Sequence, residues 1–535
     1  MTDASLPSGG IEPAVSESAE VEEHRARVRR RLLPPGPTDR LAGWVGALVV
    51  TVLAGVLRFW QLGQPHAFVF DETYYAKDGF GLLNYGYEQD FIDKADDKIL
   101  NGDLNVFADT ASYVVHPPLG KWIIASGEQL FGMNPFGWRV AVAVLGTLSV
   151  LLLARLVRRM TGSTVLGTIA GFLLAIDGLH LVMSRTALLD LPLSFFLLAA
   201  FGALVFDREH GRRRAAARLE GFEGSTFGPG LGFRPWRILA GVLLGAALAT
   251  KWNALFFVFA FGLLTVWWDV SARRVAGARS PWLGSLSRDA LPAFLFIVPT
   301  ALVTYIVTWS GWLFTSGGYN RTWGSENPST LFRWVPDSLR SLWHYHAEAW
   351  RFHTGLNSNH PYESHPWSWL VQGRPVSFYY QEYGRGELGC DVERCAREVL
   401  AVGNPIIWWS SAAALLVMVW LLISKRDWRA GAVLAALAAG WLPWFWYADH
   451  NERTMFSFYA VSFLPFLIMA ITICLGFILG PKDSSPRRRA VGATAVGGFL
   501  LLAAMAAVAM APLWMAQVLP YEDWLNRLFG IRSWI

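Results

Sequence analysis

Long blocks of apolar residues, separated by shorter polar connections, dominate the pattern along the chain. A helix needs about 20 apolar residues to cross the roughly 30 Å hydrocarbon core of a membrane. The pattern therefore predicts an all-α polytopic membrane protein with about 11 transmembrane helices. These spans are expected at residues 42–60, 137–154, 163–183, 191–206, 237–250, 253–268, 290–310, 404–423, 430–447, 455–479 and 491–513.

Two connections, at residues 61–136 and 311–403, are too long to be simple turns, and loops of this length usually carry function. Each contains an apolar, aromatic stretch too short to span, at 120–131 and 334–350, which predicts an amphipathic helix lying in the membrane interface. The domain organisation that follows is a disordered cytoplasmic tail at 1–40, an N-terminal transmembrane catalytic module at 41–310, a long loop at 311–403 and C-terminal transmembrane helices at 404–535.

Composition and charge agree with this class. Hydrophobic residues make up 53% of the chain and charged residues 16%, below the roughly 25% typical of soluble domains. The net charge of +5 comes from Lys and Arg concentrated in alternate short connections, such as RLVRR and GRRRAAAR. This is the positive-inside asymmetry, so the basic runs are interpreted as topology anchors and not as a nucleic-acid surface. The expected location is the plasma membrane, with a cytoplasmic N-terminus and an extracytoplasmic C-terminus.

Adjacent carboxylates at Asp71 and Glu72 follow the first span by about ten residues. Charges so close to lipid are costly unless they are paired or used. A carboxylate there can accept the proton of a hydroxyl during group transfer, which makes the pair a candidate general base. The alternative is a solvated turn before an interfacial helix.

Cations gather on the same predicted side of the membrane. His116 and Lys121 lie in the string HPPLGK, Arg139 opens the second span, and Lys251 interrupts the apolar blocks at a tight turn. Arg and Lys can hold a phosphate together, the first as a fork and the second as a point charge. The alternative is that these side chains extend to lipid headgroups.

Further polar residues complete the candidate site. Arg185 and Asp190 are spaced as an ion pair with a mainly structural role, and Asp177 near them fits either a structural or a functional role. In the second long loop, the aromatic and imidazole groups of His360, Tyr362 and Trp367 can line a groove for an acceptor peptide or pack on the interface. The remaining candidates for the substrate cavity are Tyr74, Asn253 and Arg453.

Three cysteines provide little for metal binding or redox chemistry. Cys390 and Cys395 share an extracytoplasmic loop, where a disulfide is permitted, and the pair is interpreted as either a structural disulfide or two free thiols. Seven carboxylates between residues 88 and 109 are interpreted as a solvated loop and not as a metal site.

Taken together, these strings resemble the protein O-mannosyltransferase family, multi-spanning enzymes of the GT-C class. The resemblance rests on eight pieces in the family's order: Asp71-Glu72, HPPLGK at 116–121, FGWR at 136–139, SRTALLD at 184–190, TKWNALF at 250–256, HPYESHPWSWL at 360–370, GNPIIWW at 403–409 and FYAVSFLPFL at 458–467. Eukaryotic members carry a β-trefoil module in the later long loop. The loop at 311–403 is too short for one, which is typical of the bacterial, actinobacterial-type members.

The resemblance implies an inverting transfer of mannose from polyprenyl-phosphate-mannose to Ser or Thr of exported proteins, without a cofactor or an obligatory metal. Asp71 would be the general base, Glu72 would position donor or acceptor, and Arg139 and Lys251 would contact the donor phosphate. Related GT-C enzymes begin the HPPLGK string with Lys, whereas His116 can be neutral at pH 7. The expected partners are the lipid donor, acceptor proteins and the secretion machinery.

Other functions remain open at this point. Within enzymes, the alternatives are another lipid-linked sugar, such as arabinose, or a glycolipid acceptor. A transporter or lipid flippase would place its ionisable groups near the bilayer midplane in repeated halves, and neither feature is visible. A structural scaffold would not explain cations gathered beside a carboxylate pair.

Overall fold

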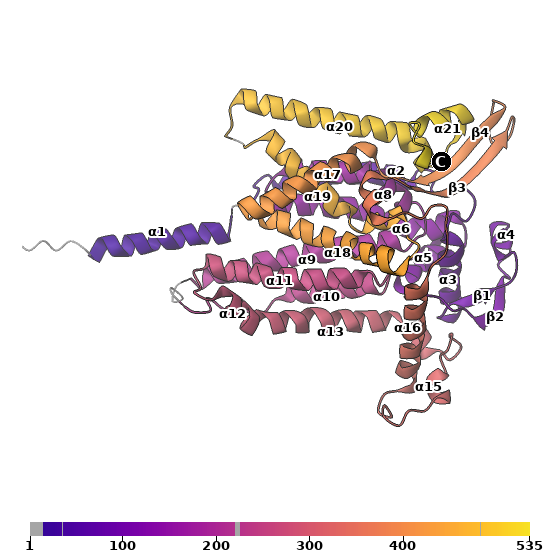
Figure 1. Ribbon diagram of the computed structural model, residues 1–535, viewed down its shortest axis with the longest axis horizontal. Coiled ribbons are helices and arrows are strands. Elements are labelled where there is room, and N and C mark those ends of the chain that lie inside the picture. The colour runs from indigo at the N-terminus through magenta and orange to yellow at the C-terminus, as the bar shows by residue number, and fades with distance from the viewer. Residues whose placement is uncertain (1–13, 35, 220–224, 482, 535) are drawn as a thin grey trace, which may run out of the picture.

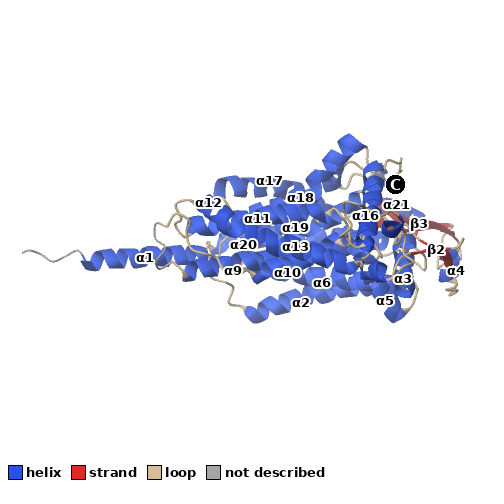
Figure 2. Cartoon of the chain, turned by 90° about the horizontal axis from the view of Figure 1, so that it is seen from below, coloured by secondary structure: helices blue, strands red, loops and turns tan. Residues whose placement is uncertain are grey.

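The computed structural model describes residues 14–34, 36–219, 225–481 and 483–534. Long helices run side by side in one bundle, and the connecting segments gather at its two ends (Figure 1). The strands are confined to one of these ends (Figure 2). The architecture is therefore a helical membrane bundle with its irregular structure held at the ends.

The bundle and its end segments follow one another along the chain without a separate soluble domain among the described residues. The bundle helices are α2 (Arg40–Phe59), α6 (Pro135–Thr161), α7 (Thr164–Ala175), α8 (Gly178–Ser184), α9 (Asp190–Ala217), α10 (Pro235–Leu248), α11 (Ala254–Val275), α13 (Leu291–Thr308), α17 (Pro405–Trp420), α18 (Trp428–Asn451), α19 (Leu464–Leu479) and α20 (Pro486–Trp514). The remaining helices are α1 (Ala14–Leu32), α3 (Glu72–Tyr85), α4 (Ala95–Leu100), α5 (Leu119–Phe131), α12 (Pro281–Ser285), α14 (Ser310–Phe314), α15 (Trp323–Glu326), α16 (Asp337–Gly355) and α21 (Tyr521–Arg527).

Eight helices of the described chain are long and apolar enough to cross a membrane. α7 and α8, which meet at 64°, bring the number to nine if the bent pair is taken as one broken span. α10 and α19 are apolar but only 14 and 16 residues long. All of the predicted blocks fall on helices, yet the expected count of 11 spans is not confirmed.

The span expected as one helix at 163–183 is broken at Asp177. Asp177 Oδ1 accepts a hydrogen bond from the His180 amide at 3.0 Å and so caps α8. On the other side of the break, the Arg58 guanidinium donates to the last carbonyls of α7, those of Leu174 and Ala175, at 3.3 and 3.4 Å. The freed backbone groups are thus satisfied inside the bundle, as a membrane requires, and Asp177 has a structural role.

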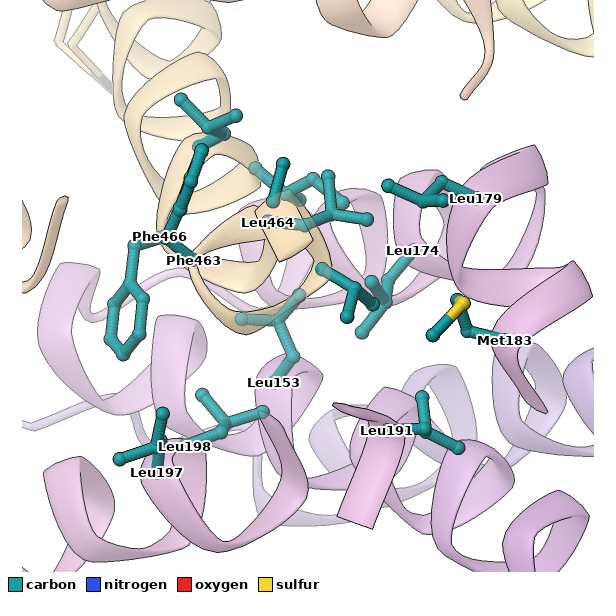
Figure 3. Packing of buried hydrophobic residues seen from close by; sticks show 14 of the residues in the cluster. Leu153, Leu174, Leu179, Met183, Leu191, Leu197, Leu198, Phe463, Leu464 and Phe466 are labelled. Atoms are coloured by element: carbon teal, nitrogen blue, oxygen red, sulfur yellow. The ribbon is translucent and has the colours of Figure 1, made fainter. Parts of the chain in front are cut away.

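The centre of the bundle is formed by helices that are apolar on all sides. α19 is buried along almost its whole length, and α9 is the most buried of the long spans. Figure 3 shows the packing of Leu153, Leu174, Met183, Leu198 and Phe466, from α6, α7, α8, α9 and α19. α2, α13 and α20 bury a much smaller share of their surface, which places them at the rim toward lipid.

Residues 14–32 form the helix α1, where the sequence predicts a disordered tail. Ala, Glu and Arg favour helix formation here, and the last turn is held by packing. Leu32 is buried against Ala215 and Ala216 of α9, and Arg212 Nε donates to the Leu32 carbonyl at 3.0 Å. Residues 1–13 of the expected tail lie outside the described residues.

At the end of the bundle near α1, basic residues form a buried ion-pair network in addition to any topological role. Arg234 contacts Asp207 at 2.5 Å and Asp269 at 3.1 Å, and Arg237 contacts Asp207 at 3.0 Å. Arg273 contacts Asp289 at 2.7 Å. The network ties α9, α10, α11 and the π-helical segment Leu286–Ala290 before α13 together, at the opposite end of the bundle from α3 (Figure 1).

Both long connections and the C-terminus lie at the opposite end from α1 (Figure 1). The amphipathic helices predicted there are present as α5 and α16, and α16 runs across the direction of the spans. β1 (Gln89–Phe91) pairs with β2 (Phe107–Ala111) in the first long connection. β3 (Val376–Gly384), β4 (Arg394–Ala401) and β5 (Val518–Pro520) form an antiparallel sheet in that order.

Candidate active site

Asp71 lies at the N-terminus of α3, on a backbone segment held in an uncommon conformation. Phe70, directly before it, has a φ of 53°, in the left-handed region that non-glycine residues seldom adopt. The Phe70 ring is stacked on Phe378 of β3 at 4.6 Å between centroids and meets Phe458 edge-on at 5.6 Å. Such conformations persist where the surroundings enforce them and are common at functional sites. The aromatic contacts therefore hold the backbone conformation before Asp71, and with it the direction of the Asp71 side chain.

Glu72 is fully buried and its carboxylate is saturated by donors. It accepts hydrogen bonds from the amides of Val69 and Ala187, both at 2.9 Å, and from Arg139 Nε and Nη2 at 2.8 and 2.7 Å. The two neighbouring amides bring together the first long connection and the segment between α8 and α9. Glu72 therefore acts as an anchor for the turn that carries Asp71.

Arg139 has no donor left for a ligand in this arrangement. A guanidinium has five N–H groups. Two of them bind Glu72, and the other three donate to the carbonyls of Leu62, Pro65 and Ala67 at 3.2, 3.1 and 2.9 Å. The geometry thus differs from the expected phosphate contact, because the cation is enclosed by the loop that it holds.

Lys251, in the turn between α10 and α11, is paired with Asp190 at the start of α9. Its Nζ lies 2.9 and 2.8 Å from the two carboxylate oxygens and 4.8 Å from the centre of the Tyr459 ring. Burial alone would lower the pKa of Lys251, but Asp190, Tyr459 and Asp71 raise it above the usual value. Lys251 therefore stays charged.

The expected ion pair between Arg185 and Asp190 does not form. Asp190 begins a new helix after a turn, so the two side chains diverge, and Asp190 contacts Lys251 instead. Arg185 donates to carbonyls at the end of α2 and just beyond it, those of Leu57, Arg58, Trp60 and Gln61.

Asp71 and Lys251 are brought within electrostatic range of each other. Burial raises the pKa of Asp71 to about 6, Lys251 opposes this rise, and Asp190 adds to it. The Tyr75 hydroxyl lies 3.5 Å from Asp71 Oδ2. Asp71 is only partly covered, unlike Glu72. A carboxylate with a pKa near 6 is ionised at neutral pH and is a stronger base than an ordinary Asp.

His116 lies close to this group, whereas Lys121 belongs to another. The His116 ring is 5.1 Å from that of His353 on α16, and its Nδ1 is buried without a partner. Burial, followed by the charge of Lys251, holds the pKa of His116 well below its usual value, so the ring is neutral. It cannot serve as a fixed cation for a phosphate at neutral pH.

Lys121 is fully buried in contact with Glu88, and its Nζ lies 3.8 Å from Asp78. Two protein carboxylates therefore take the place of the phosphate expected beside Lys121. The contact also corrects the prediction for the acidic stretch, because Glu88 is buried and paired and not solvated. Elsewhere in that stretch, Asp96 pairs with Lys77 at 2.7 Å.

The residues expected in the substrate cavity divide into two groups. Near the site, the His360 ring packs edge-on against Phe456 at 5.0 Å, Arg453 donates to the His353 carbonyl, and Asn253 Oδ1 is buried without a partner. Tyr74 and Trp367 point outward instead, with 64% and 65% of their surface exposed. Tyr362 lies between His360 and the Arg374 guanidinium, which is 5.2 Å from its ring.

Sequence reasoning missed the roles of Tyr75, Asp190, His353 and Tyr459. The position of Tyr75 could have been found, since it follows Asp71 by four residues and so shares a helix face with it. Tyr459 and His353 carry no local signal, because each reaches the site through tertiary packing from a distant segment.

Cys390 and Cys395 form a disulfide, with an S–S distance of 2.02 Å, near the turn between β3 and β4. Cys474 is a free thiol. Across the described residues, no group of three or more His, Cys, Asp or Glu side chains has an arrangement suited to a metal ion.

Comparison with known proteins places this arrangement in a family. Residues 48–315 match the model of dolichyl-phosphate-mannose-protein mannosyltransferases, and residues 338–528 match that of the C-terminal four-helix region of protein O-mannosyltransferases. The polyprenol-phosphate-mannose–protein mannosyltransferase of Mycobacterium tuberculosis H37Rv is 39% identical over 93% of both chains. The one from Corynebacterium glutamicum is 34% identical over 94% of this chain and 96% of its own.

The fold agrees with a solved structure as well. The S. cerevisiae protein O-mannosyltransferase Pmt1–Pmt2 complex, bound to the sugar donor, superposes with a TM-score of 0.69 over 95% of both chains, at 14% sequence identity. The chain therefore belongs to the protein O-mannosyltransferase family.

Proposed function

We propose that the protein transfers mannose from polyprenyl-phosphate-mannose to Ser and Thr hydroxyls of exported proteins. The bacterial relatives that match over more than nine-tenths of the chain are named for this reaction with a polyprenol-phosphate-mannose donor and a protein acceptor. The observation that carries the proposal is the position of Asp71, a partly covered carboxylate with a raised pKa, within electrostatic range of the half-buried cation of Lys251, which Asp190 holds in place.

The reaction is a single displacement with inversion. The acceptor oxygen attacks C1 of mannose while Asp71 accepts the hydroxyl proton. The bond between C1 and the phosphate oxygen breaks, its electron pair stays on the phosphate, and polyprenyl phosphate leaves. Lys251, held in place by Asp190, stabilises the charge that develops on the phosphate. The donor itself supplies the activated sugar, so the proposal includes no cofactor and no metal.

Glu72 and Arg139 support this chemistry without touching the substrate. Arg139 binds carbonyls of the turn from Leu62 to Ala67, and Glu72 accepts the amide of Ala187. The ion pair thus holds both segments around the start of α3. Both charges are enclosed, so their contribution is to keep Asp71 in one orientation. We therefore assign Glu72 and Arg139 a positioning role, in place of contacts with donor or acceptor.

The site is expected to face the outside of the cell membrane. The short basic connections lie at the end of the chain's bundle that carries α1, and the positive-inside rule puts that end in the cytoplasm. The end with Asp71, both long connections and the C-terminus would then be extracytoplasmic. Acceptors would arrive there as they leave the secretion machinery, which makes that machinery a candidate partner.

A panel of donors tests the proposal. The purified protein in lipid nanodiscs is incubated with a Thr-containing peptide and with polyprenyl phosphates carrying labelled mannose, glucose or 4-amino-4-deoxy-arabinose. Transfer to the peptide from the mannose donor alone is the expected result. Equal or better transfer from another sugar, or transfer only to a glycolipid, would favour a different GT-C activity. Movement of the donor across vesicles without any glycosylated product would indicate a transporter.

A further inference from the structure

One edge of the three-stranded sheet is free of partners among the described strands. The strand order β3-β4-β5 leaves the other side of β3 unpaired, although β3 is nine residues long. Proteins usually protect such an edge with Pro, Lys or a covering segment. β3 contains neither Pro nor Lys, and Tyr380, Gln381 and Glu382 are exposed.

The charge on this strand is neutralised within the hairpin. Glu382 pairs with Arg394 of β4, at 2.8 Å to Nε and 2.6 Å to Nη2, and accepts the Tyr380 hydroxyl at 2.6 Å. An approaching polypeptide therefore meets a row of backbone N–H and C=O groups without a net charge to repel it. This is the surface to which an extended peptide adds as a further strand.

The start of β3 packs against the residue that precedes the candidate base. Phe378 of β3 stacks on Phe70, whose carbonyl carbon is bonded to Asp71, and also meets Phe458 edge-on at 5.4 Å. Phe458 precedes Tyr459, the ring over Lys251. The pairing register of β3 shifts between Ser377 and Tyr379, and irregularities of this kind are frequent next to active sites.

From Phe378 the strand leads away from the site for six residues. At ~3.3 Å per residue, Gly384 lies about 20 Å farther along the strand. An extended chain paired with β3 would thus begin near Phe70, next to Asp71, and its following residues would be aligned along the edge.

We propose that the acceptor polypeptide binds as an added strand on the free edge of β3, which leads its Ser or Thr hydroxyl to Asp71. Recognition through the main chain suits acceptors of varied sequence, because every residue offers the same backbone groups. This inference rests on the proposed function, since it concerns how that reaction takes its acceptor.

N-methyl scanning of the acceptor tests the pairing. A nine-residue Ala-rich peptide with one central Thr is methylated at one backbone nitrogen at a time, and kcat/KM for mannose transfer is measured with the full-length protein. In a strand pair, alternate amides face the partner. Methylation of every second amide on one side of the Thr should lower kcat/KM at least tenfold, and methylation of those between should change it less than threefold.

A uniform effect along the peptide, or one limited to the Thr itself, would overturn the strand pairing while leaving the proposed function intact. Absence of transfer to the unmethylated peptide would instead count against the proposed function.

Disulfide trapping locates the peptide independently. Gln381→Cys on β3 should react with a peptide carrying an activated thiol at least tenfold faster than Glu393→Cys, an exposed control in the turn before β4. An excess of unmodified peptide should suppress the faster reaction. Equal rates, or a disulfide between two copies of the Gln381→Cys protein that peptide does not suppress, would show that the edge does not take the acceptor.

Discussion

Lys251 Nζ contacts both carboxylate oxygens of Asp190, at 2.9 and 2.8 Å, across 61 residues of sequence. The pair joins the turn between α10 and α11 to the start of α9, and both charges act on Asp71 in opposite directions. The cation that we propose for the donor phosphate is thus held in position by a carboxylate that also raises the pKa of the candidate base. Substitution of Lys251 or of Asp190 can therefore separate the proposed contact with the donor phosphate from the effect on the pKa of Asp71.

The first prediction concerns the pH dependence of the unmodified protein. Asp71 must be ionised to accept a proton, and burial raises its pKa to about 6. Below that pH, kcat/KM should fall about tenfold per unit as the carboxyl becomes protonated, and above it the profile should level off. A pH profile of peptide mannosylation measures this. An acid limb near pH 4, the ordinary range of Asp, would contradict the raised pKa of Asp71.

The second prediction is a pair of opposite shifts of that limb. Lys251 lowers the pKa of Asp71, so Lys251→Met should move the acid limb to higher pH. Asp190 raises the same pKa, so Asp190→Asn should move the limb to lower pH. The two profiles, recorded at matched donor saturation, provide controls for each other. Shifts in the same direction, or no shift, would show that the acid limb does not report Asp71 under the influence of Lys251 and Asp190.

The third prediction concerns donor binding. Loss of the cation in Lys251→Met should weaken binding of polyprenyl-phosphate-mannose at least tenfold, because a charge-assisted contact to phosphate is lost. Lys121→Met is the matched control, since Lys121 is likewise paired with carboxylates inside the protein but faces Glu88 and Asp78. Its donor affinity should change less than threefold, even if its thermal stability falls. Equal losses of affinity would show that Lys251 has no special contact with the donor.

The fourth prediction concerns the pair of Glu72 and Arg139. Removing one partner leaves a buried charge unpaired, which costs about 3–5 kcal/mol. Arg139→Met and Glu72→Gln should each lower the midpoint of thermal unfolding and reduce kcat, while the KM for the donor changes little. The double variant should be more stable than the sum of the single losses predicts. A selective rise in donor KM for Arg139→Met would instead favour contact with the phosphate.

Much of this arrangement could be predicted from local sequence. Asn134 and Asn404 each precede a Pro and cap α6 and α17, so the starts of these helices are visible as Asn-Pro. Asp71 was identifiable as a candidate base because its chemistry and its distance from the first span are local features. The break at Asp177 also has a local signal, since Asp before Gly is a helix cap, but the apolar pattern continues across it.

The remaining features depend on tertiary contacts that no spacing shows. Arg139 matches a family motif, yet only the structure shows that its guanidinium is paired with Glu72, one position after the candidate base. Asp190 was paired with Arg185 by spacing, although the turn between them separates the two side chains. The role that we propose for β3 depends on the contact of Phe378 with Phe70, from a strand more than 300 residues later in the sequence.

The most direct test of the account is Asp71→Asn, compared with Glu128→Gln. Glu128 is a carboxyl of α5 in the same long connection, buried to 4% exposure and without a hydrogen-bond partner. Turnover of peptide mannosylation and binding of polyprenyl-phosphate-mannose are measured for both. Asp71→Asn should lower kcat by about a hundredfold or more and keep the donor affinity, while Glu128→Gln stays within threefold of the unmodified protein. Near-normal turnover in Asp71→Asn would contradict the assignment of Asp71 as the base.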